Sequence, residues 1–229
     1  APPAQMLKLS AGGIHGATVA AQKAFFASAS GVHWIDTRQV KLNDPASITP
    51  QLIELGKIGD QPRHTGHFSK LGNRVGFVSG TGADAELGIL DADPTPPVLT
   101  KLSIPIAEGH EPGGLELIKP RRGNPIALLF QEQPGDSKSQ LTMIELDPNG
   151  DQKWNDLRVG PSYSIGPARM EGHSGHHAIG IDSDQFRCVL TNPGNGTLSV
   201  YSLDQRKLLM NYTVGGSPTR IAVYGGHVH

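Results

Sequence analysis

A repeated segment that ends in aspartate constrains the fold of this chain more than any other feature of its sequence. The four aspartates are Asp36, Asp91, Asp147 and Asp204, at intervals of 55, 56 and 57 residues. A short apolar run precedes each of them, such as Gly88-Ile89-Leu90 before Asp91. Because a regular period of tens of residues is typical of repeat architectures, we expect a series of similar units.

The fourth repeat is the clearest unit. Its alternating apolar and polar residues predict four short strands, at residues 178–181, 185–191, 197–203 and 207–214. A turn of residues that tolerate positive φ, 192–196, joins the middle two, and Gly215-Gly216-Ser217-Pro218 follows the last. Strand, tight turn, strand, Asp, strand and Gly-Gly-Ser-Pro resemble a blade of the YVTN-type, WD40-like β-propellers. The period also favours a propeller over a β-sandwich, which stays open as the alternative.

We therefore predict an all-β protein, a β-propeller of four-stranded blades that forms a single domain over residues 1–229. The repeats span approximately 10–60, 61–107, 108–166 and 167–216, with a closing strand in 217–229. An outer-type strand at residues 5–9 precedes them. The number of blades stays open. Four or five blades would close a small ring, whereas a larger ring would need further residues or a second copy, which would make the protein a homo-oligomer.

Composition excludes several classes of function. The net charge is −1 and no basic block is present, so we expect no nucleic-acid binding. No apolar run approaches about 20 residues, so we expect no membrane span. Cys188 is the single cysteine, so an intrachain disulfide is excluded. Its position in a predicted strand favours a buried thiol over a nucleophile. The start, Ala1-Pro2-Pro3, is interpreted as a terminus left by signal-peptide cleavage, hence a periplasmic or secreted protein, with a trimmed chain as the alternative.

Most of the ten histidines collect at one place in each repeat, just before the first predicted strand. Two patterns recur there, His-Ser/Thr-Gly-His and Glu-Gly-His. In a propeller the loops at this place all lie at one mouth of the central channel, so the repeat predicts a ring of imidazoles. The candidate metal ligands are His15, His64, His67, His110, His173, His176 and His177, with Glu108 and Glu171 as ligands or as partners that orient an imidazole.

Imidazoles with few carboxylates and no thiolate suit Zn, Cu or Ni, and Zn is the usual ion of tetrahedral nitrogen sites. Each single histidine also has a plainer interpretation, as a polar turn residue bonded to backbone. His33 lies on a third strand and is expected to be structural or exposed. The tail His227-Val228-His229 is either a metal-capturing end or a flexible terminus. No nucleophile elbow, zinc-protease motif or P-loop is present, so we expect no catalytic residues.

The histidine clusters and the closing segment Gly-Ser-Pro-Thr-Arg-Ile-Ala-Val-Tyr-Gly-Gly-x-x-His at 216–229 together resemble a particular family. They are similar to the periplasmic zinc metallochaperones that serve zinc ABC importers. The resemblance implies reversible zinc binding and delivery to a periplasmic solute-binding protein, without catalysis. Two alternatives stay open: a metal-dependent enzyme of the lactonase or hydrolase type, and a protein-interaction scaffold with incidental histidines. Metal content separates the scaffold from the other two.

Overall fold

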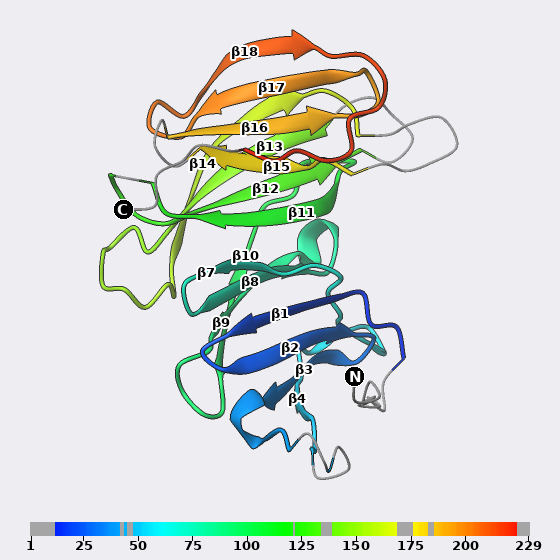
Figure 1. Cartoon of the computed structure of the whole chain (residues 1–229), viewed down its shortest axis with the longest axis vertical. Coiled ribbons are helices and arrows are strands. Elements are labelled where there is room, and N and C mark those ends of the chain that lie inside the picture. The colour runs from blue at the N-terminus through cyan, green and yellow to red at the C-terminus, as the bar shows by residue number, and fades with distance from the viewer. Residues whose placement is uncertain are drawn as a thin grey trace. The chain divides into compact units, whose positions relative to one another are not determined.

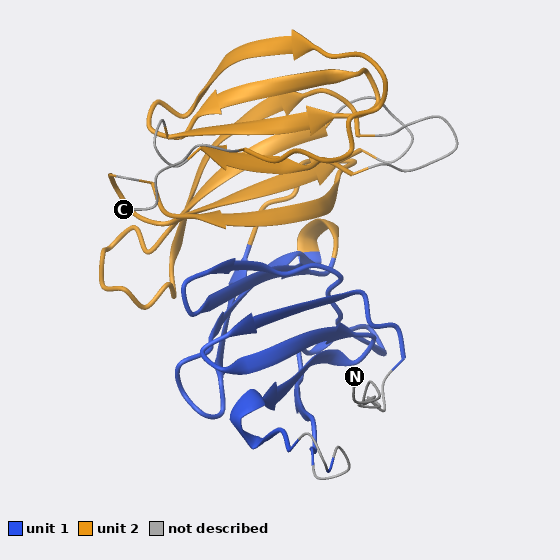
Figure 2. Ribbon diagram, viewed as in Figure 1, with its two compact units in different colours: residues 1–80, 84–103 blue, residues 81–83, 104–229 orange. Residues whose placement is uncertain are grey.

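The computed structural model describes residues 12–41, 44, 48–120, 122–133, 139–168, 176–182 and 186–223. The chain divides into two compact units (Figure 2). Unit 1 contains residues 1–80 and 84–103, and unit 2 contains residues 81–83 and 104–229. The single domain over residues 1–229 stays a prediction. The expected strand at residues 5–9 lies outside the described residues.

Unit 1 contains two four-stranded antiparallel sheets (Figure 1). In each, strands that are neighbours in sequence are antiparallel neighbours in the sheet. The first sheet consists of β1 (Gly16–Ala20), β2 (Lys23–Ser28), β3 (Gly31–Asp36) and β4 (Gln51–Ile53). The second consists of β7 (Ser69–Leu71), β8 (Arg74–Ser79), β9 (Glu86–Asp91) and β10 (Val98–Ser103). A short hairpin, β5 (Lys57–Ile58) with β6 (Gln61–Pro62), was not predicted.

Unit 2 contains two further sheets of the same kind. The third sheet consists of β11 (Glu111–Ile118), β12 (Ile126–Glu132), β13 (Ser139–Leu146) and β14 (Leu157–Ile165). The fourth consists of β15 (Ile179–Asp182), β16 (Arg187–Asn192), β17 (Thr197–Ser202) and β18 (Lys207–Thr213). Each predicted repeat therefore holds one sheet of four strands. The four-stranded repeat that the sequence predicted is confirmed.

The expected closing strand differs from the structure. Residues 217–223, the described part of the predicted 217–229 segment, have no strand conformation. Their apolar side chains nevertheless contact the fourth sheet: a Cβ on Gly180 of β15 would lie 2.7 Å from Val223 Cγ2 and 3.4 Å from Ile221 Cγ2. The apolar alternation of this segment therefore reflects side-chain packing, not backbone pairing.

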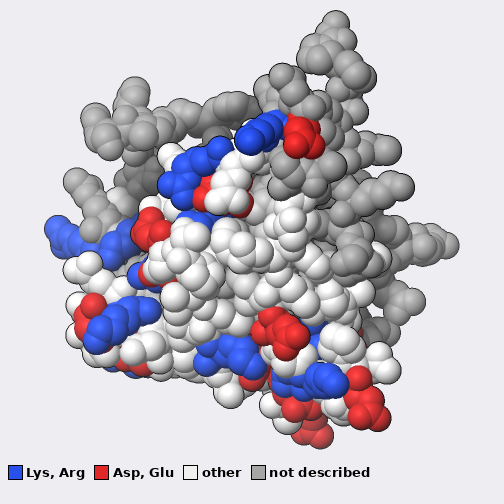
Figure 3. All heavy atoms as spheres, turned by 90° about the horizontal axis from the view of Figure 1, so that it is seen from below, with Lys and Arg blue, Asp and Glu red and all other residues white. Residues whose placement is uncertain are grey.

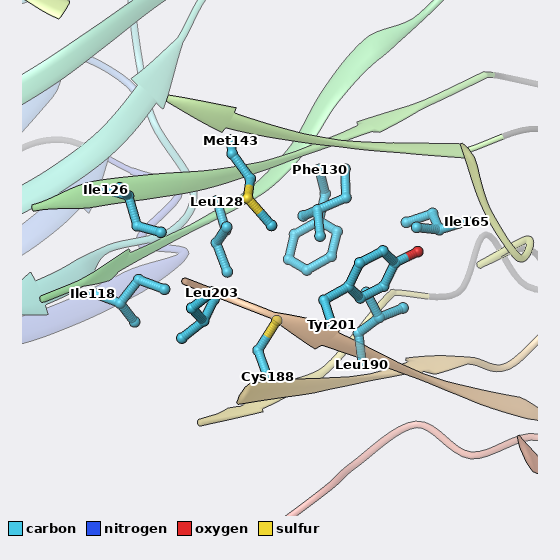
Figure 4. Packing of buried hydrophobic residues seen from close by; sticks show 11 residues of the cluster. Ile118, Ile126, Leu128, Phe130, Met143, Ile165, Cys188, Leu190, Tyr201 and Leu203 are labelled. Atoms are coloured by element: carbon cyan, nitrogen blue, oxygen red, sulfur yellow. The ribbon is translucent and has the colours of Figure 1, made fainter. Parts of the chain in front are cut away.

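Each unit has its own buried core. Phe25, Trp34, Phe77 and Leu90 belong to the cluster of unit 1. In unit 2, side chains of the third and fourth sheets point toward one another between the two sheets (Figure 4). Cys188 lies in this second cluster, as expected, and burial raises the pKa of its thiol to about 12. A thiol in that state is not a nucleophile at neutral pH.

Candidate functional site

Histidines precede the first strand of every four-stranded sheet. His15 comes directly before β1, and His64 and His67 come before β7. His110 comes directly before β11, and the pair His176 and His177 comes before β15. His173 and Glu171 lie outside the described residues, as do His227 and His229. The position that defined the candidate ligands is thus the same in all four sheets.

In unit 1 the backbone beside His15 touches the backbone beside His67. A Cβ on Gly16 would lie 2.9 Å from the Gly66 carbonyl oxygen and 3.7 Å from His67 Cα. Likewise, a Cβ on Gly66 would lie 3.8 Å from His15 Cβ. Gly16 allows the two backbone segments to approach this closely because it carries no side chain, whereas a Cβ on Gly66 would make an ordinary contact. The first strands of two consecutive sheets thus bring His15 and His67 into one neighbourhood, with both side chains exposed.

In the third repeat, the local turn holds the His110 ring. The His110 backbone N–H donates to the Ala107 carbonyl at 3.0 Å, and Nδ1 donates to the Glu108 carbonyl at 3.0 Å. Glu108 thus orients the imidazole through its backbone, while its side chain is exposed. The remaining nitrogen, Nε2, is 3.5 Å from Gln140 Nε2, a weak bond that a metal ion can replace.

His177 is the most closely held of the candidate ligands. Its Nδ1 donates to the Thr191 carbonyl at 2.7 Å, and its ring stacks on Phe130 with centroids 5.3 Å apart. Because a carbonyl only accepts, Nδ1 carries the proton and Nε2 carries the lone pair. Among the described residues, the buried Nε2 has no hydrogen-bond partner.

The surroundings also keep the His177 imidazole neutral. Burial lowers its pKa, and the adjacent His176 contributes in the same direction against the opposing Thr191 hydrogen bond. A neutral ring with one nitrogen fixed by a carbonyl and the other free is the form in which histidine binds metal ions.

The described residues do not contain a finished metal centre. No three His, Cys, Asp or Glu side chains among them are placed to hold one ion. His33, expected to be structural or exposed, is buried, and its Nδ1 pairs with the Ser28 hydroxyl at 3.0 Å. It is therefore structural.

One carboxylate near a candidate ligand was missed. Glu132 of β12 pairs in register with Glu111, the residue after His110. Burial raises the pKa of Glu132, and the charge of Glu111 adds to the effect. No motif marks Glu132, since only the strand register brings it opposite Glu111.

On the face drawn in Figure 3, the basic and acidic side chains of the described residues lie interspersed. Within the described part of the chain, no helix has the length and apolarity needed to cross a membrane.

Comparison with known proteins identifies the architecture. No family model matches the sequence, and a search of curated proteins found no match. Among solved structures, apo AztD from Citrobacter koseri matches with a TM-score of 0.58 at 14% identity, over 94% of this chain and 52% of that one. A second AztD structure from the same organism matches with a TM-score of 0.56 at 17% identity, over 95% and 52%. Sqt1 from Saccharomyces cerevisiae gives 0.53 at 13%, over 92% and 54%.

The fold is that of a β-propeller. The chain spans about half the length of the propeller chains that it matches. The four sheets are therefore four blades, and the histidines precede the first strand of each blade. The match to AztD confirms the predicted resemblance at the level of the fold.

Proposed function

We propose that this propeller binds zinc through the histidines that precede its first strands, and passes the ion to a periplasmic solute-binding protein of an ABC importer. The observation that carries the proposal is the repeated position of these histidines, with His15 and His67 in neighbouring backbone segments of unit 1. A site assembled from successive blades requires this arrangement.

The state of His177 supports metal binding in unit 2. Its free Nε2 lone pair and neutral ring need no proton release before an ion binds. His176 stands beside it, and His173 completes the predicted ligand set of this repeat. The ligand roles of Glu108 and Glu171 belong to the proposal as well. Zn²⁺ is the expected ion, with Cu²⁺ or Ni²⁺ as competitors for imidazole sites.

The proposed role is storage and delivery without catalysis, in the periplasm. A metal-dependent hydrolase keeps an open coordination position and a general base beside the ion, usually with carboxylates among its ligands. The candidate set is dominated by imidazoles, which favours a carrier over an enzyme. The resemblance to the periplasmic zinc metallochaperones, together with the propeller fold, supports the same choice.

Zinc content of the purified protein tests the proposal. We expect stoichiometric Zn²⁺ at neutral pH with a dissociation constant below about 1 μM, and loss of that binding in the double variant His67→Ala/His176→Ala. His33→Gln is the matched control, because His33 is buried in a blade away from the first strands and its loss should leave zinc binding intact. If the unaltered protein does not bind zinc with a dissociation constant below about 1 μM, the zinc site is rejected, and the protein-interaction scaffold remains as the interpretation.

Transfer is tested separately. The zinc-loaded protein is mixed with a metal-free periplasmic zinc-binding protein of an ABC importer, and zinc is measured on each after separation. Movement faster than release of zinc to a chelator supports direct delivery. Equal rates would reduce the proposal to zinc storage.

A further inference from the structure

The loop between β13 and β14 holds a buried carboxylate that has no cationic partner among the described residues. Asp147 ends β13 and is 4% exposed. Its Oδ2 accepts the Gln152 backbone N–H at 2.9 Å, so the carboxylate points into the loop. Its Oδ1 is buried and has no hydrogen-bond partner within the part of the chain that the structure describes. An ionised carboxylate in such a place is costly unless a positive group balances it.

The equivalent aspartates of the other repeats show how this charge is usually balanced. Asp36 forms an ion pair with Arg38, and Asp91 forms one with Arg74. Asp204, in the fourth repeat, is exposed to water. Asp147 is therefore the one member of the four that is buried and has no basic side chain in contact within the described residues.

The loop after Asp147 places further oxygens at alternate positions. Asn149 Oδ1 accepts the Asp151 N–H at 2.9 Å, and Asp151 Oδ1 accepts the Lys153 N–H at 2.9 Å. Gln152, the sixth residue counted from Asp147, has a φ of 65°. Calcium loops of the EF-hand type have oxygen ligands at positions one, three and five and a sharp turn at position six, normally made by glycine. Here the turn is kept although the residue is glutamine.

A further carboxylate oxygen lies at the other end of the loop. Asp156 Oδ1 is also buried, and no described residue forms a hydrogen bond with it. The Asp156 carbonyl accepts the Asp147 N–H at 3.4 Å, which joins the two ends of the loop. Two buried acceptor oxygens that receive no hydrogen bond from the described residues thus lie at the two ends of one ten-residue segment, 147–156.

We propose that the segment 147–156 is a Ca²⁺ site, formed by the Asp147, Asn149 and Asp151 side chains and closed by Asp156. The site is separate from the histidine site, and its all-oxygen ligand set suits a hard cation, not Zn²⁺ or Cu²⁺. No three carboxylates of the described residues already surround one point. Amide and carbonyl oxygens therefore supply part of the shell, and binding draws Asp151 and Asp156 inward.

Trp154 lies inside the segment and supplies the readout. An indole close to bound Tb³⁺, which replaces Ca²⁺ at oxygen sites, transfers excitation energy to the ion. We expect excitation of tryptophan to produce Tb³⁺ emission that added Ca²⁺ abolishes, with a calcium dissociation constant of about 1 mM or lower, as in extracellular calcium modules. Zn²⁺ at the same concentration should leave the emission unchanged. Displacement by Zn²⁺ but not by Ca²⁺ would overturn the proposal.

Substitutions locate the ion. Asp147→Asn and Asp151→Asn should each weaken Ca²⁺ binding at least about tenfold, because each removes a charged ligand. Lys153→Ala should strengthen it severalfold, since the Lys153 ammonium, 3.2 Å from the Asp151 carboxylate, competes with the ion. Asp204→Asn, the equivalent position of the next repeat, should have no effect.

Two of these variants keep the test informative even if the third does not fold. Asp151 and Lys153 lie at the surface end of the loop, so their variants stay informative if Asp147→Asn does not fold. Unchanged Ca²⁺ affinity in both Asp151→Asn and Lys153→Ala would overturn the assignment. The same holds if the unaltered protein does not bind Ca²⁺ at concentrations several-fold above about 1 mM.

Discussion

At the scale of single residues, Gly88 is constrained by its neighbour Phe77. A Cβ on Gly88 would overlap the end of the Phe77 ring, which is fully buried. We predict that Gly88→Ala lowers the free energy of unfolding by about 1–3 kcal/mol, because a rigid ring in a packed core has no space to move into. Denaturant unfolding followed by Trp34 fluorescence measures the change.

Two further variants test this explanation. Gly12→Ala is the control, since among the described residues no atom beyond its chain neighbours lies within 4 Å of a Cβ there, and it should be neutral or slightly stabilising. Phe77→Leu replaces the ring with a shorter side chain. In that background, Gly88→Ala should lower the free energy of unfolding by less than it does alone. An equal cost in both backgrounds would show that Phe77 is not the cause.

Some properties of the candidate site could be predicted from single residues of the sequence, and others could not. The repeated histidine positions were predictable, because a period is visible in the letters alone. The environment of His177 was not, because Thr191 and Phe130 lie on other strands and meet the ring only after the sheets have paired and packed. Asp147 was predicted as one of the four aspartates that end a repeated segment, but the absence of a hydrogen-bond partner for its Oδ1 among the described residues depends on burial that spacing does not encode.

At the scale of elements, the Glu145 carboxylate contacts side chains from three other parts of unit 2. It lies on β13 and accepts hydrogen bonds from Arg158 of β14 and from Asn124 in the turn before β12. Arg206, in the turn between β17 and β18, is 3.5 Å from the same carboxylate. Glu145 is buried, whereas the side chains of Arg158 and Arg206 are 65% and 39% exposed. The pairs are thus partly screened by solvent.

We predict that Glu145→Gln lowers the free energy of unfolding by about 1–2 kcal/mol at pH 7. The Arg158 hydrogen bond is the main reason that the pKa of Glu145 is lowered in the folded protein. A lowered pKa stabilises the fold above the unfolded value of about 4.3, and the contribution is lost as the pH falls through the folded value. The difference between variant and parent should therefore shrink below about pH 4.

Chemical denaturation over a series of pH values checks this prediction. Glu54→Gln serves as the control, since Glu54 is exposed just after β4 and should give no difference at any pH. A destabilisation by Glu145→Gln that stays constant down to the lowest pH would mean that shape, not charge, is responsible.

Elements also differ in how well the sequence predicts them. In the fourth repeat, β17 and β18 begin and end within a residue of the predicted limits 197–203 and 207–214. The hairpin of β5 and β6 was missed because each strand has two residues, too few to show a period. In the third repeat, Trp154 has a φ of 55° and lies in the loop, and the outer strand β14 begins only at Leu157.

At the scale of the whole molecule, the two units have separate cores. Each unit contains one of the two tryptophans of the chain. Trp34 is buried in the core cluster of unit 1, and Trp154 is buried in the loop between β13 and β14 of unit 2. The variants Trp154→Phe and Trp34→Phe therefore allow the unfolding of each unit to be followed by itself.

We predict that Leu90→Ala, which empties part of the unit 1 core, lowers the unfolding midpoint reported by Trp34 more than the one reported by Trp154. Leu90 is fully buried, and such truncations cost about 2–5 kcal/mol. Leu128→Ala in the unit 2 core should have the reverse effect. In chains built from repeats, cooperativity extends only as far as the interfaces between neighbours are strong. If both variants shift both signals equally, the units unfold as one body, which contradicts this prediction and supports the single domain expected from the sequence.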